Sequence, residues 1–136
     1  MAIVNIRDTG RNSAKTADVR ALATKVQKPS DTEAITAANT ITAAESGTRF
    51  VMNVAAAKVQ TLPTPAAGLE YWFYVGATEP TGTHTIVTAS SANIIVGNVS
   101  SPEDAAGNVA TVTDADTISL VASKAVHGDF VHVWSD

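Results

Sequence analysis

The chain has 136 residues, a formal net charge of −4 and no cysteine. A chain of this length is expected to form one domain that buries about two thirds of its unfolded surface, and the lack of cysteine excludes disulfides, thiolate metal sites and cysteine nucleophiles. The acidic balance argues against a nucleic-acid surface, because such a surface needs clustered lysine and arginine to displace phosphate counterions.

Charged residues make up only 16% of the chain. A free monomer normally carries more surface charge for solubility, so we expect copies of the chain or a partner to cover part of the surface. The basic residues are also uneven, since eight of the nine lie within the first 58 residues and only Lys124 lies beyond. This distribution predicts a basic amino-terminal part and an acidic remainder. Ordinary solvated charge is the favoured interpretation of the basic part, and docking on an acidic partner surface is the alternative.

Residues 1–7 place short apolar side chains in an extended pattern that ends at Asp8-Thr9-Gly10, which predicts a strand or an extended arm. A segment this short buries nothing alone and must pair with a sheet edge, in its own chain or in a neighbour. It lacks the apolar core of a signal peptide, and no run of about 18 apolar residues that could span a membrane occurs in the chain. The candidate contact residues of this arm are Ile3, Val4, Ile6, Arg7 and Arg11.

Residues 13–28 are predicted to form the one helix of the chain. Val19, Leu22, Ala23 and Val26 recur at helical spacing and give one narrow apolar stripe. Pro29 ends the pattern. Because alanine and threonine fill the other faces, the helix is marginal alone and must dock through this stripe, which adds Val19, Leu22 and Val26 to the candidate contacts.

From residue 31 onward, turn residues recur every 8 to 12 positions, which is typical of an all-β sandwich or barrel. No repeat of 20 to 50 residues is apparent, so no solenoid is expected. We predict a mainly β fold, an antiparallel β-sandwich or barrel over residues 31–136, preceded by an amino-terminal arm and one short helix over residues 1–30. The predicted strands span residues 34–41, 49–54, 58–62, 69–75, 84–88, 93–99, 109–113, 117–122 and 129–134.

The stretch of residues 71–75 is a continuous aromatic and β-branched run between glycine-containing turns, which predicts a strand buried on both faces. If two of its rings faced solvent, they would form a platform for a carbohydrate. The favoured interpretation is that alternate rings fill the core and the others a subunit contact, because aromatic rings contribute most when desolvated.

The spacing of the three histidines does not favour a metal site. In an extended segment Phe130, His132 and Trp134 share one face, whereas His127 lies in the preceding turn. Two ligands on one strand would stand at positions i and i+2, so we expect surface or interface imidazoles, including His84, and no metal or cofactor.

Catalytic chemistry is not indicated. Thr83-His84 and Ser135-Asp136 are adjacent in sequence, but adjacency is not triad geometry and no Gly-x-Ser-x-Gly motif occurs. No catalytic residue is therefore predicted.

Residues 101–108, SPEDAAGN, form a long polar connection between two predicted strands. The carboxylates of Glu103 and Asp104 in this loop, and those of Asp114 and Asp116 farther on, are explained better as turn residues than as the acids of a glycosidase. A calcium site at Asp114 and Asp116 is an alternative. We expect an exposed binding tip made by Ser101, Pro102, Glu103, Asp104 and Asn108.

Several short segments resemble small β-structured virion proteins of tailed bacteriophages, a group that includes capsid decoration (cement) proteins and modules of head or tail fibres. The resemblance covers residues 41–136 and leaves residues 1–30 outside. The segments are TAAESGTRF (residues 42–50), VQTLP (59–63), AGLEYWF (67–73), THTI (83–86), NII (93–95) and GDFV (128–131).

The resemblance implies a homotrimer on the particle surface, made in the host cytoplasm, and it carries no catalytic residue to this chain. The expected function is therefore that of a decoration protein, in which the arm and helix contact the major capsid protein or a neighbouring subunit, with no nucleic-acid or membrane partner. The alternative is a receptor- or glycan-binding module of a head or tail appendage, acting through the loop of residues 101–108 or through exposed aromatic rings.

Overall fold

The computed structural model describes residues 31–100 and 109–136, so the predicted arm and helix of residues 1–30 lie outside the described chain. The described part is mainly β, as predicted, with one turn of 3₁₀ helix, η1, at Ala43–Glu45. The strands are β1 (Thr32–Ile35), β2 (Asn39–Thr40), β3 (Arg49–Met52), β4 (Val59–Thr61), β5 (Leu69–Val75), β6 (His84–Val87), β7 (Ile95–Ser100), β8 (Val109–Ala115), β9 (Thr117–Leu120) and β10 (Phe130–Ser135).

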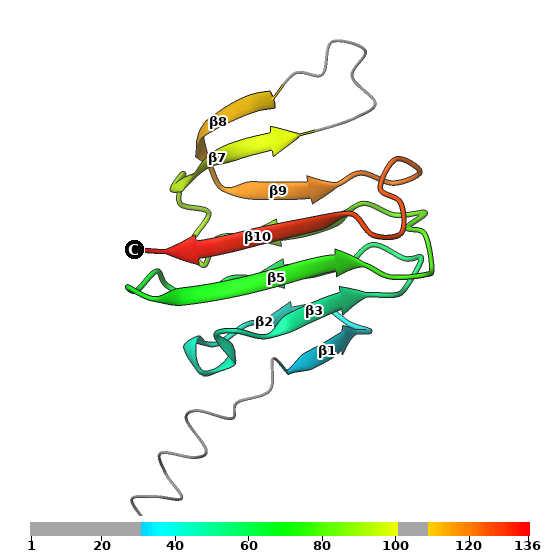
Figure 1. The fold of residues 1–136 in the computed structure, drawn as a ribbon, viewed down its shortest axis with the longest axis horizontal. Helices are drawn as coiled ribbons and strands as arrows, with labels where there is room; N and C mark the ends of the chain where they lie inside the picture. The colour runs from blue at the N-terminus through cyan, green and yellow to red at the C-terminus, as the bar shows by residue number, and fades with distance from the viewer. Residues whose placement is uncertain (1–30, 101–108) are drawn as a thin grey trace, which may run out of the picture.

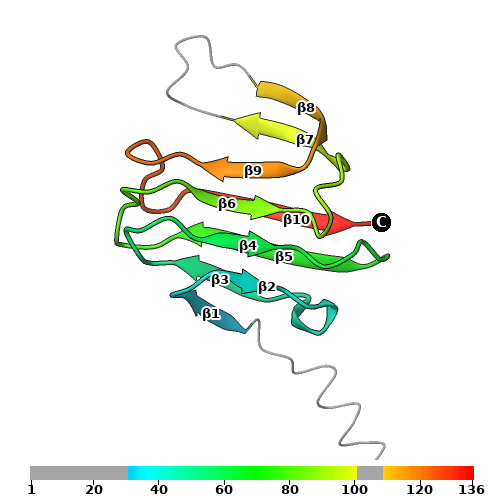
Figure 2. The same ribbon diagram turned by 180° about the vertical axis from the view of Figure 1, so that it is seen from behind.

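The strands form two open four-stranded sheets and a separate two-stranded ribbon of β7 and β8. The first sheet has the order β1-β3-β5-β10, and the second has the order β2-β4-β6-β9. Figure 1 shows the first sheet in front of the second, and Figure 2 shows the same two layers from behind. Successive strands from β1 to β6 therefore alternate between the two layers.

The prediction of antiparallel pairing throughout is wrong. β1, β3 and β5 pair in parallel, and so do β2, β4 and β6. Antiparallel pairing is found between β5 and β10, between β6 and β9, and within the ribbon. Short connections between strands are typical of hairpins. In this structure they lead instead from one layer to the other, so the chain forms a strand of the other sheet before it returns to the first. This longer connection is what a parallel neighbour requires. None of the three sheets in the described residues closes into a barrel.

The core lies between the two layers and is built from alternate residues of each strand. On β5 the side chains of Tyr71, Phe73 and Val75 are buried, as expected where one face of a strand meets the core. Phe73 stacks on Phe50 of β3 with ring centroids 5.3 Å apart. The remaining buried apolar residues are Ile35, Ile41, Met52, Leu62, Ile86, Leu120 and Ala125.

Each predicted strand region contains a strand of the structure, but residues 34–41 do not form one element. β1 ends at Ile35 and β2 spans Asn39–Thr40, and the two strands belong to different sheets. The chain bends between them because it passes from the first layer to the second at this point.

His84 is fully buried at the start of β6, so the expectation of a surface or interface imidazole is wrong for this residue. The backbone N–H of Lys58 donates to Nδ1 at 3.1 Å, which leaves Nε2 to donate to the carbonyl oxygen of Val54 at 3.0 Å. A neutral imidazole with its proton on Nε2 satisfies both groups. His84 thereby anchors residues 54–58, which cross between the layers, to β6.

Replacing His84 by alanine should lower the free energy of unfolding by about 3 kcal/mol, because the change leaves a cavity and two backbone groups without their partner. Urea unfolding followed by tryptophan fluorescence measures the loss. The matched control is His127→Ala, an exposed histidine, which should change stability by less than about 0.5 kcal/mol. Equal effects of the two substitutions would contradict the anchoring role.

Tyr71 ties η1 to the core. Its hydroxyl donates to the carbonyl oxygen of Thr42 at 3.1 Å, and Thr42 caps η1 through its backbone N–H and hydroxyl, which both donate to the Glu45 carboxylate. Burial raises the pKa of the Tyr71 phenol above 10.0, and the negative charge of Glu45 raises it further. The folded state therefore favours the neutral phenol.

The raised pKa of Tyr71 predicts a loss of stability at alkaline pH. The contribution of the phenol is fully present below its unfolded pKa of about 10 and is lost as the pH rises through the higher folded value. Tyr71→Phe should flatten the decline in unfolding free energy above about pH 10. Denaturant unfolding at a series of pH values compares the variant with the unmodified chain, and the same slope in both would refute this assignment.

Candidate functional site

A row of aromatic side chains lies on the outer face of the first sheet. Trp72 and Tyr74 point outward from β5 because they alternate with the buried residues of that strand. β10 pairs with β5 so that Phe130 stands opposite Tyr74 and His132 opposite Trp72, with Trp134 next along the strand. We call these five residues, Trp72, Tyr74, Phe130, His132 and Trp134, the aromatic face.

The position of Trp72 and Tyr74 corrects the expectation that residues 71–75 are buried on both faces. Their side chains are only partly buried, whereas Tyr71, Phe73 and Val75 are inside. The run of residues 71–75 is continuously apolar because one face of β5 packs in the core and the other face forms an aromatic surface.

The rings of the aromatic face contact one another. The imidazole of His132 stacks on the indole of Trp72 with centroids 3.7 Å apart and planes within 8°. The Trp72 ring also lies 6.2 Å from that of Tyr74 and 5.9 Å from that of Phe130, and His132 lies 5.1 Å from Trp134. Phe130 and Trp134 remain 58% and 68% exposed, so the row ends in large apolar surfaces that face solvent.

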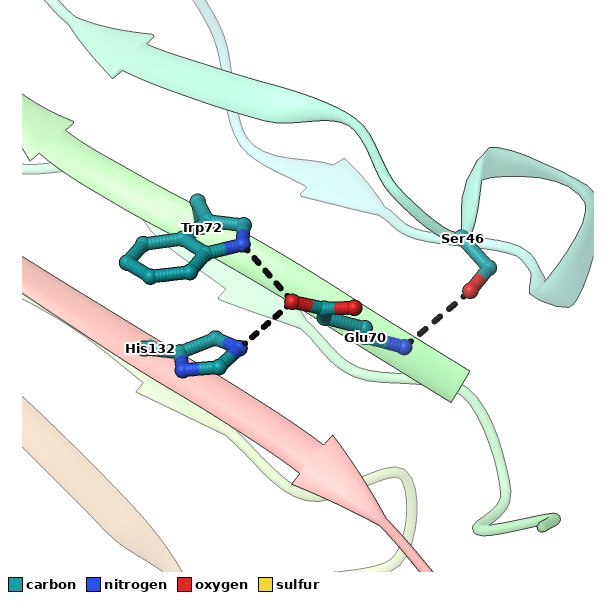
Figure 3. Close-up of polar contacts among 4 residues, drawn as sticks. All are labelled: Ser46, Glu70, Trp72 and His132. Carbon is teal, nitrogen blue, oxygen red and sulfur yellow. Dashed lines mark hydrogen bonds and ion pairs between the residues drawn. The ribbon is translucent and has the colours of Figure 1, made fainter. Parts of the chain in front are cut away.

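Glu70 orients the centre of the aromatic face. Its Oε1 accepts a hydrogen bond from Trp72 Nε1 at 3.1 Å and lies 2.9 Å from Nε2 of His132, as Figure 3 shows. Its own backbone N–H donates to the Ser46 hydroxyl at 3.0 Å. The carboxylate holds an indole and an imidazole from two strands in fixed positions while about half of its own side chain stays exposed. When His132 is protonated, the same contact becomes an ion pair.

The aromatic face is bordered by β3. Arg49 is exposed and stands opposite Trp72 in the sheet, and Val51 stands opposite Tyr74. Arg49, Lys58 and Lys124 are the basic residues of the described chain, which carries nine acidic ones. One arginine thus flanks the rings in an otherwise acidic domain.

This arrangement suits binding by desolvation. Scattered exposed apolar residues carry no information, but a contiguous patch marks an interaction site. Aromatic and arginine side chains are enriched at protein interfaces and supply most of the binding energy there. Because stacking and Glu70 already orient the central rings, a partner would pay little conformational entropy to meet them.

The contact residues predicted from the sequence do not belong to the described chain. Ile3, Val4, Ile6, Arg7, Arg11, Val19, Leu22 and Val26 lie outside it, and so do Ser101, Pro102, Glu103, Asp104 and Asn108. Both predictions therefore stay predictions.

The three histidines have different environments in the structure. Both ring nitrogens of His84 bond to backbone groups, His127 is exposed in the turn before β10, and His132 belongs to the aromatic face. No group of three histidine or acidic side chains gathers at metal-binding distance within residues 31–100 and 109–136. Within the same residues, no helix is long and apolar enough to cross a membrane.

The aromatic face was not predicted as one surface. The sequence did place Phe130, His132 and Trp134 on one side of a strand, and the register confirms this prediction. The missing information was the pairing of β5 with β10, which brings His132 to Glu70 across 62 positions. The shared alternation of rings in two strands is the signal that could have indicated it.

Comparisons of the chain with protein-family models, with curated proteins and with solved structures gave no significant match.

Proposed function

We propose that the protein is a decoration protein of a tailed bacteriophage, which binds the major capsid protein on the outside of the head through the aromatic face. The observation that carries this proposal is the exposed, pre-oriented row of rings on the outer face of β5 and β10, flanked by Arg49. The low fraction of charged residues and the resemblance of residues 41–136 to phage virion proteins support it.

The proposal includes a β-sandwich of the two facing sheets with an amino-terminal arm, assembled as a homotrimer on the virion surface. Its mechanism is binding alone, with no catalytic step, cofactor, nucleic acid or membrane. A protein that bridges capsomers adds interface that expansion of the shell must break, and binding to the intact shell stabilises that shell by mass action. Contacts that are individually weak become strong when several subunits engage together.

Substitutions on the aromatic face should weaken binding to heads without unfolding the chain. Trp134→Ala and Phe130→Ala should each weaken binding at least about tenfold, which corresponds to about 1.4 kcal/mol. Their stabilities should change by less than about 1 kcal/mol because both side chains are largely exposed. Co-sedimentation of the full chain with purified heads that lack it measures binding.

The matched control for these variants is Val59→Ala, which truncates an exposed apolar residue on β4 of the other sheet. It should bind heads as the unmodified chain does. Unchanged binding by both aromatic variants, or an equal loss in the Val59 variant, would contradict the role of the aromatic face.

The basic amino-terminal part provides a second prediction for the same function. Arg7→Glu combined with Arg11→Glu in the full chain should weaken head binding, and the difference should shrink as salt is raised, because exposed charges are screened. Lys58→Glu, a charge reversal within the β domain, is the control. If the double arginine variant binds heads as well as the unmodified chain at low salt, the amino-terminal arm does not contact the head.

Glycan binding is the second candidate function, and the geometry of Glu70 favours it. A carboxylate held between an indole and an imidazole, with half of its side chain exposed, presents a hydrogen-bond acceptor beside ring surfaces, which suits a sugar. A glycan array with the full chain tests this candidate, and binding that is lost in Glu70→Ala while head binding persists would favour it. No signal on the array would leave the decoration protein as the proposal.

A further inference from the structure

Glu70 brings a negative charge to the aromatic face, and only one of its two carboxylate oxygens is engaged. Nε1 of Trp72 and Nε2 of His132 both contact Oε1, at 3.1 Å and 2.9 Å. A carboxylate oxygen has two lone pairs, so these two contacts use the capacity of Oε1. Oε2 has no hydrogen-bond partner among the described residues (Figure 3). The aromatic face therefore presents a charged acceptor that is held in place and open to a ligand.

An exposed aromatic ring stands beside this acceptor. Trp134 lies directly opposite Glu70 in the pairing of β10 with β5, and residues directly opposite each other share a face with their Cβ atoms about 5 Å apart. Trp134 is 68% exposed, and its ring centroid lies 5.1 Å from that of His132. A cation attracted to an indole lies within about 6 Å of the ring centre. One cation is therefore within reach of both Oε2 and the Trp134 ring.

No basic residue compensates the charge of Glu70. Arg49 borders the aromatic face, but within residues 31–100 and 109–136 the only ion-pair contact of Glu70 is with His132. That contact is an ion pair only when the imidazole is protonated. The described residues include nine acidic and three basic ones, which gives them a formal charge of −6 with histidines neutral. Charge complementarity therefore favours a positively charged ligand.

A partner that covers the aromatic face removes water from Oε2. An ionised group without water is stable only when it is paired. A neutral sugar or an apolar surface supplies at most a hydrogen bond and leaves the charge of Glu70 unpaired. A guanidinium group supplies a positive charge, N–H donors and a plane that stacks on an indole, whereas an ammonium group lacks the plane.

We propose that the aromatic face binds a cationic side chain, with an arginine guanidinium of the partner paired to Oε2 of Glu70 and stacked on Trp134. Trp72 and His132 keep the carboxylate in position through Oε1. The source of the arginine rests on the proposed function, under which it is a residue of the major capsid protein. The site itself is made by this chain alone, so its ligand preference is measured without heads.

Titration of the full chain with N-acetylarginine amide tests the site, and N-acetylcitrulline amide is a neutral ligand of nearly the same shape. Trp72 and Trp134 are the only tryptophans of the chain, so tryptophan fluorescence reports on the aromatic face alone. At constant ionic strength and about pH 8, where histidines are neutral, the arginine amide should give a saturable change in the millimolar range. The citrulline amide should bind at least about tenfold more weakly, because it carries no charge.

Substitutions locate the bound ligand. Glu70→Gln removes the charge but keeps an oxygen for Trp72 and His132, and it should weaken binding of the arginine amide at least about tenfold. Trp134→Leu removes the ring, leaves Trp72 as the reporter and should weaken binding about threefold. The matched control is Glu79→Gln, which neutralises an exposed carboxylate between β5 and β6 and should bind as the unmodified chain does. Circular dichroism establishes that the variants keep the β fold.

The proposal is overturned if the arginine amide gives no saturable response, if the two amides bind equally, or if Glu70→Gln binds as Glu79→Gln does. A response to a neutral sugar such as maltose, with none to the arginine amide, also overturns it and assigns the aromatic face to glycans. Head binding is measured separately. Arginine binding that needs Glu70, together with head binding that Glu70→Gln leaves unchanged, keeps the cation site and rejects the head as its partner.

Discussion

The period-two alternation of β5 is the constraint on which both the core and the candidate surface depend. Tyr71, Phe73 and Val75 fill the space between the two sheets, and Trp72 and Tyr74 stand on the outside of the same strand. A shift of one residue in register would exchange the two sets, so the strand must be held firmly. Parallel pairing with β3 on one side and antiparallel pairing with β10 on the other supplies that hold, and Glu70 fixes the two central side chains of the outer face.

The alternation of strands between layers explains how a short chain builds both a shared core and an outer aromatic surface. β1 to β6 build the parallel part of both sheets, and β9 and β10 then close each sheet with an antiparallel strand. β10 completes the aromatic face, whereas β7 and β8, inserted before β9, leave the body of the domain as a ribbon. The low content of charged residues has a structural counterpart in the exposed rings of the aromatic face.

Local patterns predicted the strands better than their pairing. The bounds of β5 follow from the glycines that flank it, and the shared face of Phe130, His132 and Trp134 follows from the spacing of strand residues. The layer crossings were not predictable, because a short connection between strands fits a hairpin as well as a passage to the other sheet. The burial of His84 was not predictable from local sequence either, because its hydrogen-bond partners are backbone groups 26 and 30 residues away. The aromatic face required the pairing of β5 with β10, and the only signal for it in the sequence is the alternation of rings that the two strands share.

The most direct test of the proposed decoration function is the number of copies of this chain relative to the major capsid protein, measured by quantitative mass spectrometry on phage particles purified from cells that produce the chain. A decoration protein that binds across the head lattice should be present at a ratio near one to one. A few copies per particle, or none, would contradict lattice-wide binding through the aromatic face and would favour a role at a vertex or a tail.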